Sequence, residues 1–320
     1  MDDILLASSD VGLLMETKRF LSSKFDMKDL GEASYVLGIE IHRDRRNGIL
    51  GLSQKAYLEK ILKKYNMHAS RASPAPIVKG EKYGRFQCPR NKFEIDRMKA
   101  VPYASAVGSL QYAQVCTRSD LTFVTGLLGR YQDNPGIEHW NLVKKALRYV
   151  QGTTGLMLTY RKSDYLEIKG YSDADFAGDI DDRKSTSGYV FTLVGGAISR
   201  RSSKQTITAS STMYAEFIAS HVATGQVMWL KKFIPDLRVV DCIVRPLKLY
   251  CDNQLVVFYT HNNKSSHAFK PIEIKYYVVK DRIQDNTISL EHIGTKDMLA
   301  DPLTKGLPPS VFIKHIAGWV

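Results

Sequence analysis

The chain has 320 residues, of which 44% are hydrophobic, so it is long enough for two or three packed units and too apolar for general disorder. Its 45 Lys and Arg outnumber its 33 Asp and Glu, and the resulting charge of +12 suits a polyanionic partner such as a nucleic acid. The four cysteines form no Cys-x-x-Cys pair, which argues against a zinc site or a disulfide framework. No apolar run approaches the ~20 residues that span a bilayer and no signal peptide is recognisable. We therefore expect a soluble intracellular protein, cytoplasmic or nuclear, without membrane contact.

The first half of the chain alternates short apolar runs with turns and then becomes helical. An Asn47-Gly48 dipeptide is a strong hairpin signal between two apolar runs. Residues rich in Pro and charge predict a loop or linker over 70–99, and Asn134-Pro135-Gly136 separates two helices. The predicted strands are 4–7, 34–43 and 49–52, and the predicted helical segments are 13–25, 53–67 and 103–151.

From about residue 164 the order of elements changes to strands followed by alternating helices and strands. A Gly195-Gly196 pair marks a turn, and a long helix is predicted over 212–234. The predicted strands are 166–173, 187–198, 203–209, 247–251 and 288–293. Further helices are expected from about residue 253, over 272–284 and over 296–305. Three strands, then helix, strand, helix, strand and helix, is the element order of the ribonuclease H fold.

Several strings along the chain resemble, in order, the C-terminal part of a copia-type LTR retrotransposon Pol polyprotein. They are DDILLASSD, FDMKDLGEASYVLGIEI, LSQKAYLEKIL, YASAVGSLQYA, RKSTSGYVF, SSTMYAEF, YCDNQ and ADPLTKGLPP. The resemblance implies an α/β (α+β) protein with a ribonuclease H-like mixed five-stranded sheet and helices. A truncated reverse transcriptase palm and a mainly helical thumb or connection segment would precede it. The implied domains are 1–52 (palm remnant), 53–163 (helical region with its linker) and 164–320 (ribonuclease H-like).

The same resemblance assigns four scattered carboxylates as metal ligands, namely Asp173, Glu216, Asp252 and Asp301. Cutting RNA by two-metal chemistry requires carboxylates that hold two Mg²⁺ ions, although Mn²⁺ could serve, and such ligands must come from different elements. Asp173 ends a predicted strand, and Glu216 lies on a largely apolar helix face, where an unpaired acid is costly. Asp252 follows a strand in a Tyr-Cys-Asp-Asn context, and Asp301 lies in Ala-Asp-Pro-Leu-Thr-Lys.

Other interpretations remain open for these positions. Asp175 could replace Asp173, Asp252 could be only a helix N-cap, and Asp297 competes with Asp301. His292 is similarly placed to a retroviral ribonuclease H histidine implicated in proton transfer and product release, but a strand histidine can also be structural.

Two further sets of residues concern polynucleotide chemistry. Asp2 and Asp3 resemble the second and third polymerase carboxylates and are vestigial if the upstream palm aspartate is absent. Basic residues proposed to grip substrate phosphates, with solvated surface charge as the alternative, are Arg183, Lys184, Arg200, Arg201 and Lys204.

The chain departs from the family pattern at a few positions. Arg200 replaces a usual aromatic residue, Tyr214 stands where glutamate is common, and Lys270-Pro271 replaces a lysine-histidine pair. The implied function is Mg²⁺-dependent hydrolysis of the RNA strand of RNA–DNA hybrids without polymerase activity. The alternative is a degenerate fragment that only binds nucleic acid or is inactive. Other Pol subdomains would be partners in a polyprotein.

Overall fold

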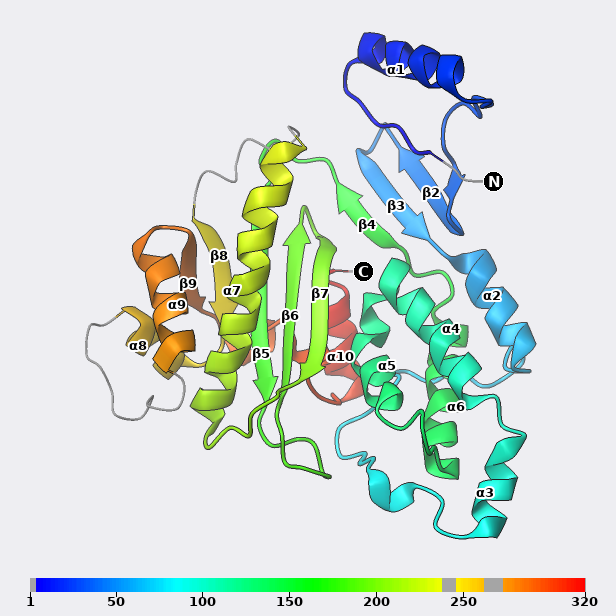
Figure 1. Ribbon diagram of the computed structural model, residues 1–320, viewed down its shortest axis with the longest axis vertical. Helices are drawn as coiled ribbons and strands as arrows, with labels where there is room; N and C mark the ends of the chain where they lie inside the picture. The colour runs from blue at the N-terminus through cyan, green and yellow to red at the C-terminus, as the bar shows by residue number, and fades with distance from the viewer. Residues whose placement is uncertain (1–3, 238–245, 262–272, 320) are drawn as a thin grey trace.

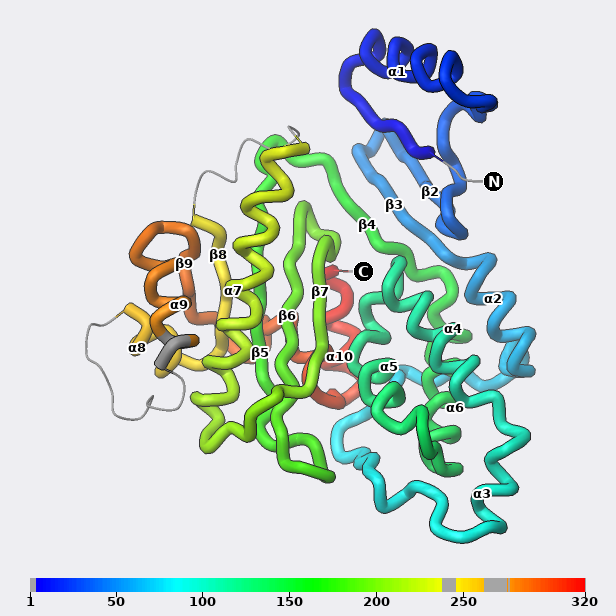
Figure 2. Tube along the Cα trace, viewed as in Figure 1, coloured from blue at the N-terminus to red at the C-terminus, as the bar shows by residue number. Residues whose placement is uncertain are grey.

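Two β-sheets and a helical region form the computed structural model, which describes residues 4–237, 246–261 and 273–319. Figure 1 shows the small sheet at the N-terminal end, the helical region beside it, and the larger sheet with helices on both sides. The chain passes from the small sheet through the helical region, returns to the small sheet as its last strand, β4, and then enters the larger sheet (Figure 2).

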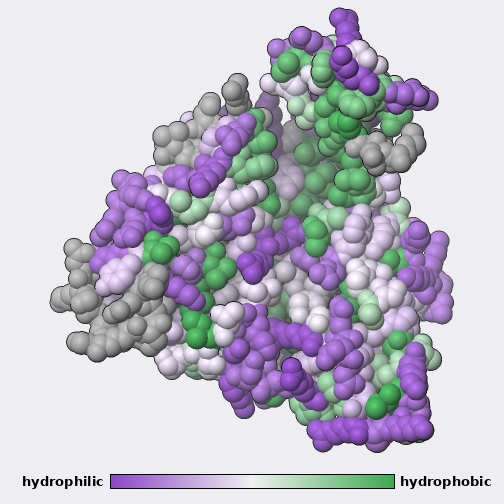
Figure 3. Space-filling view, in the orientation of Figure 1, coloured by the Kyte–Doolittle hydropathy of each residue, from purple (hydrophilic) through white to green (hydrophobic). Residues whose placement is uncertain are grey.

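The N-terminal unit is a four-stranded antiparallel sheet in the order β1-β2-β3-β4, with one helix beside it. Its strands are β1 (Tyr35–Val36), β2 (Ile39–Asp44), β3 (Ile49–Ser53) and β4 (Leu158–Arg161), and its helix is α1 (Val11–Lys24). Exposed hydrophobic side chains, including Val11, Leu13 and Phe20, belong to this unit, and Figure 3 shows hydrophobic surface over it.

Two strand predictions in this unit are wrong. Residues 4–7 form no strand, because no neighbouring strand in the described chain pairs with them, and Ile4 and Leu5 are exposed. The strand predicted over 34–43 is a hairpin instead. Leu37 and Gly38 have φ values of 50° and 76°, which reverse the chain between β1 and β2.

The helical region confirms the helices predicted within 103–151 and also contains two helices that precede that segment. Its helices are α2 (Lys55–Lys64), α3 (Lys92–Lys99), α4 (Tyr103–Cys116), α5 (Thr122–Gly129) and α6 (Ile137–Gly152), with 3-10 turns η1 (Arg85–Gln87) and η2 (Ser119–Leu121). Helix α3 lies inside the segment predicted as a linker. The Asn91 side chain caps it by accepting from the Glu94 amide, so local capping rather than an apolar stripe forms this helix.

The larger sheet has five strands in the order β7-β6-β5-β8-β9, which confirms the ribonuclease H-like fold. The strands are β5 (Ile168–Asp175), β6 (Thr186–Leu193), β7 (Gly196–Lys204), β8 (Leu247–Cys251) and β9 (Ile288–His292). β5, β6 and β7 pair antiparallel, whereas β5, β8 and β9 pair parallel. The third strand was predicted too late, at 203–209. The chain turns at Gly195, whose φ is +90°, and β7 begins at the next residue.

Helices cover both faces of this sheet. One core includes α7 (Thr212–Asp236), α8 (Gln254–His261) and α9 (Glu273–Gln284). The other core joins the helical region to β6, β7 and α10 (Pro309–Ile316), and Trp319 is fully buried in it. The helix predicted over 296–305 is instead two 3-10 turns, η5 (Thr295–Asp297) and η6 (Asp301–Leu303). Pro302 lacks a backbone N–H and cannot continue an α-helix through this segment. No helix among the described residues is long and apolar enough to cross a membrane.

Candidate metal centre

Each of the four predicted carboxylates comes from a different element. Asp173 lies near the end of β5, Glu216 in the first turns of α7, Asp252 directly after β8 and Asp301 at the start of η6. β5 and β8 are parallel neighbours in which Ser172 pairs with Cys251, so the next residues lie side by side: Asp173, still within β5, and Asp252, the first residue after β8. Carboxyl ends of parallel strands meet at one edge of a sheet, and this edge is where the acids gather.

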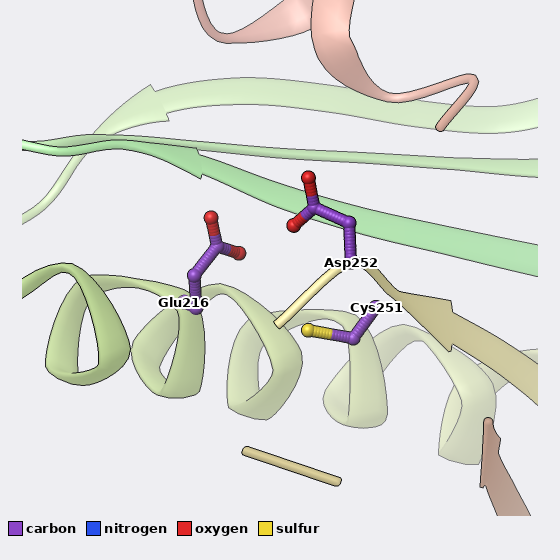
Figure 4. Close-up of side chains that lie close together, drawn as sticks. All are labelled: Glu216, Cys251 and Asp252. Atoms are coloured by element: carbon purple, nitrogen blue, oxygen red, sulfur yellow. The ribbon is translucent and has the colours of Figure 1, made fainter. Parts of the chain in front are cut away.

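The structure brings the four acids together. Oxygen atoms of Asp173, Asp252 and Asp301 all lie within 4.8 Å of one another, and Glu216 and Asp252 lie within the same limit together with the Cys251 thiol. Figure 4 shows the carboxyl groups of Glu216 and Asp252 rising on the same side of α7, with the Cys251 sulfur nearer the helix. Asp252 therefore belongs to both groups and links them.

Local hydrogen bonds fix the position of Glu216. The Ser211 side chain accepts from the Tyr214 amide at 3.1 Å and caps α7 at its N-terminus. The buried Gln205 side chain donates to the Ala215 carbonyl at 2.9 Å and to the Ser187 hydroxyl at 2.8 Å. The first turn of α7, which directly precedes Glu216, is thereby tied to β6.

Asp301 is positioned by the close docking of η6 on the sheet. Gly188 of β6 lies opposite Asp173, and a Cβ at Gly188 would be 2.6 Å from Thr304 Cγ2 and 2.9 Å from Leu303 Cβ. Only a residue without a side chain allows this approach. The Thr304 hydroxyl donates to Asp173 Oδ2, so η6 and β5 are joined at the cluster itself.

Burial dominates the electrostatics of the cluster. Asp173, Glu216 and Asp301 are 0%, 3% and 3% exposed, and Glu216 Oε2 has no hydrogen-bond partner. Burial, reinforced by the carboxylates of Asp173 and Asp252, raises the pKa of Glu216 well above its usual range. Burial, again reinforced by Asp173, raises the pKa of Asp301 to about 7. Burial also raises the pKa of Asp252.

These observations fit a site for hard divalent cations. Carboxylate oxygens are the ligands that Mg²⁺ prefers, and a cation removes the repulsion and the desolvation cost that raise these pKa values. The buried Glu216 oxygen without a partner is the group that most needs such a ligand.

One cation of the chain itself already reaches the cluster. Lys305 Nζ lies 3.0 Å from Asp301 Oδ1 and 3.4 Å from Asp173 Oδ2. The contact with Asp301 Oδ1 is an ion pair that lacks hydrogen-bond geometry. Burial opposes the charge of this ammonium, but Asp173 and Asp301 outweigh it and raise the pKa of Lys305. Sequence reasoning missed Lys305, although its spacing of four residues from Asp301 was the available signal.

The competing acids lie outside the two groups. Asp175 is half-buried two residues beyond Asp173, and burial raises its pKa to about 6. Asp297 forms an exposed ion pair with Lys314 at 3.4 Å. The geometry thus brings together the four acids that were assigned from the resemblance.

His292 lies at the exposed rim of the cluster, next to Asp252. Its Nε2 atom is 3.2 Å from the Asp252 carbonyl oxygen, while the Thr295 hydroxyl donates to Asp252 Oδ2 at 3.0 Å. These contacts hold the loop after β8 against the end of β9.

The proposed phosphate-gripping residues have different surroundings. Arg200 is half-buried, and its guanidinium donates to the Gln114 carbonyl and, at 2.7 Å, to the Val115 carbonyl at the end of α4. Lys204 forms ion pairs with Asp179 at 3.2 Å and Asp182 at 2.9 Å, and Lys184 lies 3.9 Å from Asp182. Arg183 and Arg201 are exposed.

The remaining positions singled out in the sequence divide into two groups. Tyr214 is buried in the first turn of α7, where it packs in the core on that face of the sheet. The polymerase-like Asp2 and Asp3, and the Lys270-Pro271 pair, lie outside the described residues.

Known proteins resemble this chain over nearly its whole length. The reverse transcriptase (RNA-dependent DNA polymerase) family model matches residues 1–79. The retrovirus-related Pol polyprotein from transposon TNT 1-94 of Nicotiana tabacum is 41% identical over 312 residues, which cover 98% of this chain and 23% of that protein. The corresponding polyprotein from transposon RE2 of Arabidopsis thaliana is 32% identical over 312 residues, 98% of this chain and 21% of that protein. The chain therefore spans less than a quarter of either relative.

One solved structure, LC11-RNase H1 in complex with RNA/DNA hybrid, is 18% identical and covers 44% of this chain and 96% of its own, with a TM-score of 0.32. Because that TM-score is low, the fold is assigned from the strand order of the five-stranded sheet.

Proposed function

The chain belongs to the copia-type retrotransposon Pol polyproteins, and from that premise we propose that it hydrolyses the RNA strand of RNA–DNA hybrids with Mg²⁺, as the ribonuclease H part of the polyprotein. The observation that carries the proposal is the convergence of four carboxylates from β5, α7, β8 and η6 on one edge of the sheet. Mn²⁺ is the expected substitute metal. Asp2 and Asp3 are given no role in this activity.

The residues of the cluster would have two roles, metal binding and proton transfer. Asp173, Asp301 and Asp252 would hold one cation, and Glu216 with Asp252 would reach a second. When bound, the two ions would activate the attacking water and stabilise the leaving oxygen. We propose that His292, which is exposed beside Asp252, serves in proton transfer at the rim.

Recognition of the hybrid would depend on shape and charge. A-form-like duplexes are bound through phosphates and 2′-hydroxyls rather than base edges. The exposed Arg183 and Arg201 are the best placed of the five predicted contacts, because Arg200 and Lys204 have intramolecular partners. The division into a palm remnant, a helical region and a ribonuclease H-like domain is part of the same proposal, with other Pol subdomains as partners.

A cleavage assay tests the proposal directly. Purified protein is incubated with an end-labelled RNA–DNA hybrid and Mg²⁺, with EDTA, double-stranded RNA and double-stranded DNA as controls. Cleavage of only the hybrid RNA is expected, and Asp252→Asn should abolish it while leaving the folded state intact, because the amide keeps the shape and loses the charge. If the wild-type protein leaves the hybrid uncut with Mg²⁺ and with Mn²⁺, the alternative of an inactive or merely binding fragment is correct.

A further inference from the structure

Lys305 is a feature of the cluster that a two-metal nuclease site does not require. Its ammonium lies 3.0 Å from Asp301 and 3.4 Å from Asp173, two acids whose side chains are 4% and 1% exposed. The Lys305 side chain itself is 30% exposed, so it enters the cluster from the solvent side. It contacts carboxylate oxygens of Asp173 and Asp301, two of the three acids that form the metal-ligand group with Asp252.

We propose that Lys305 is a built-in counter-ion that occupies the metal-binding carboxylates of Asp173 and Asp301 and must be displaced when a divalent cation binds. The inference deepens the proposed function and rests on it. Lys305 acts on the metal and not on the substrate, so it is a positioning residue that sets metal affinity.

The physical argument is competition for the same two carboxylate groups, those of Asp173 and Asp301. An ammonium at hydrogen-bonding distance and a Mg²⁺ ion in direct coordination cannot occupy the same face of two carboxylates. Two like charges a few ångströms apart in a partly buried site also repel each other strongly. Binding of the metal therefore carries the cost of moving the Lys305 ammonium away.

The structure gives the side chain a route for this movement. Lysine has a flexible four-carbon stem, and the exposed part of Lys305 lets the ammonium swing into water without rearrangement of η6. Asp301 and Thr304, on the buried side, keep their positions through the bond from Thr304 to Asp173. The switch thus needs only one side chain to move.

The counter-ion also has a benefit in the metal-free protein. Buried carboxylates without a partner destabilise a fold, and removing one member of a buried ion pair is costly. Lys305 satisfies part of this requirement until a metal replaces it. The same residue is therefore expected to stabilise the metal-free state and to weaken metal binding.

The test compares Lys305→Met, which keeps the stem and removes the charge, with Lys305→Arg, which keeps the charge. Lys314→Met is the matched control, because it changes the net charge equally at an exposed lysine of α10 paired with Asp297. Mg²⁺ binding is measured by calorimetric titration of each full-length protein, and thermal unfolding is measured in EDTA and in saturating Mg²⁺.

Lys305→Met should bind Mg²⁺ about tenfold more tightly than wild type. It should also unfold at a lower temperature than wild type in EDTA. Added Mg²⁺ should raise its unfolding temperature by more than it raises that of wild type. Lys305→Arg and Lys314→Met should stay close to wild type in Mg²⁺ affinity.

The contrary outcomes separate the two proposals. If wild type binds Mg²⁺ and Lys305→Met binds it equally or more weakly, the counter-ion role is overturned while the proposed function stands. Equal tightening in Lys305→Met and Lys314→Met would show a general charge effect and would also overturn it. If neither wild type nor Lys305→Met binds Mg²⁺, the proposed function fails and this inference fails with it.

Discussion

Replacement of Gly188 by alanine should inactivate the candidate metal centre without changing any of the four carboxylates that we propose as its ligands. The Cβ added at Gly188 would lie 2.6 Å from Thr304 Cγ2 and 2.9 Å from Leu303 Cβ, whereas carbon atoms in ordinary contact are about 3.5–4.0 Å apart. Segment η6 must therefore retreat from β6 by roughly 1 Å. It carries Asp301 with it, away from Asp173.

The size of the effect follows from this displacement. Overpacking of a well-packed contact costs about 1–3 kcal/mol of unfolding free energy. A misplacement of about 1 Å in a catalytic constellation costs on the order of 100-fold in rate. Gly188→Ala should thus be modestly less stable than wild type and should lose nearly all hybrid cleavage. Its affinity for Mg²⁺ should be measurably lower.

The assay needs controls that separate misplacement from unfolding. Gly225→Ala is the matched substitution, because Gly225 is an exposed residue of α7 with nothing within 4 Å of its added Cβ. It should raise the unfolding free energy by about 0.5–1 kcal/mol and leave cleavage unchanged. Adding Thr304→Ser to Gly188→Ala removes the closest methyl group and keeps the hydroxyl, so it should restore part of the lost activity.

Urea unfolding, Mg²⁺ titration and hybrid cleavage are measured for all four proteins. If Gly188→Ala cleaves the hybrid at the wild-type rate and is as stable as wild type, the docking of η6 does not depend on the absence of a side chain at this position. If Gly225→Ala also loses activity, the effect of Gly188→Ala cannot be attributed to the contact between β6 and η6.

Three further predictions concern other parts of the chain. Asp173→Asn should abolish hybrid cleavage, whereas Asp175→Asn should retain it, and the opposite result would move the first ligand to Asp175. Arg118→Met should lower the unfolding free energy by about 3–5 kcal/mol in urea titrations, because it removes the cation from an ion pair that is 0% exposed on both sides and leaves the Asp120 carboxylate with the Tyr149 hydroxyl but no charged partner; a loss below 1 kcal/mol would contradict this. Arg201→Ala should weaken hybrid binding and reduce the slope of log affinity against log salt by about one, and an unchanged slope would mean that this residue contacts no phosphate.

The strands that the sequence predicted well are those buried on alternate or both faces. β8 shows the alternation Leu247, Leu249, Cys251 in its buried residues, and it was placed correctly. β7 is the edge strand of its sheet, and its residues after Ala197 are half-buried or exposed and mostly polar. An apolar pattern cannot mark such a strand, so only the turn at Gly195 could have located it.

The four acids of the candidate site were assigned from the family resemblance, and the residues around them were not. An aspartate that directly follows a buried strand, as Asp252 does, is placed at the sheet edge by the strand itself. Lys305 and Gly188 reach the cluster only because η6 packs against β6, a contact between segments more than one hundred residues apart. No local pattern encodes that contact, so Gly188 could not be assigned from the sequence, and the only sequence signal for Lys305 was its four-residue spacing from Asp301.

The basic segment 200–204 shows why charge alone locates a nucleic-acid surface poorly. Neighbouring residues on a strand point to opposite faces, so Arg200 and Arg201 cannot both line one groove. In the register of the sheet, Arg200 pairs with Val190, whose side chain lies in the core that includes α4. The carbonyl groups at the end of α4 accept from Arg200, which satisfies part of that helix terminus. An arginine that replaces an aromatic residue there can keep the sheet and the helical region joined, so within this segment we propose Arg201, on the other face, for the phosphate contact.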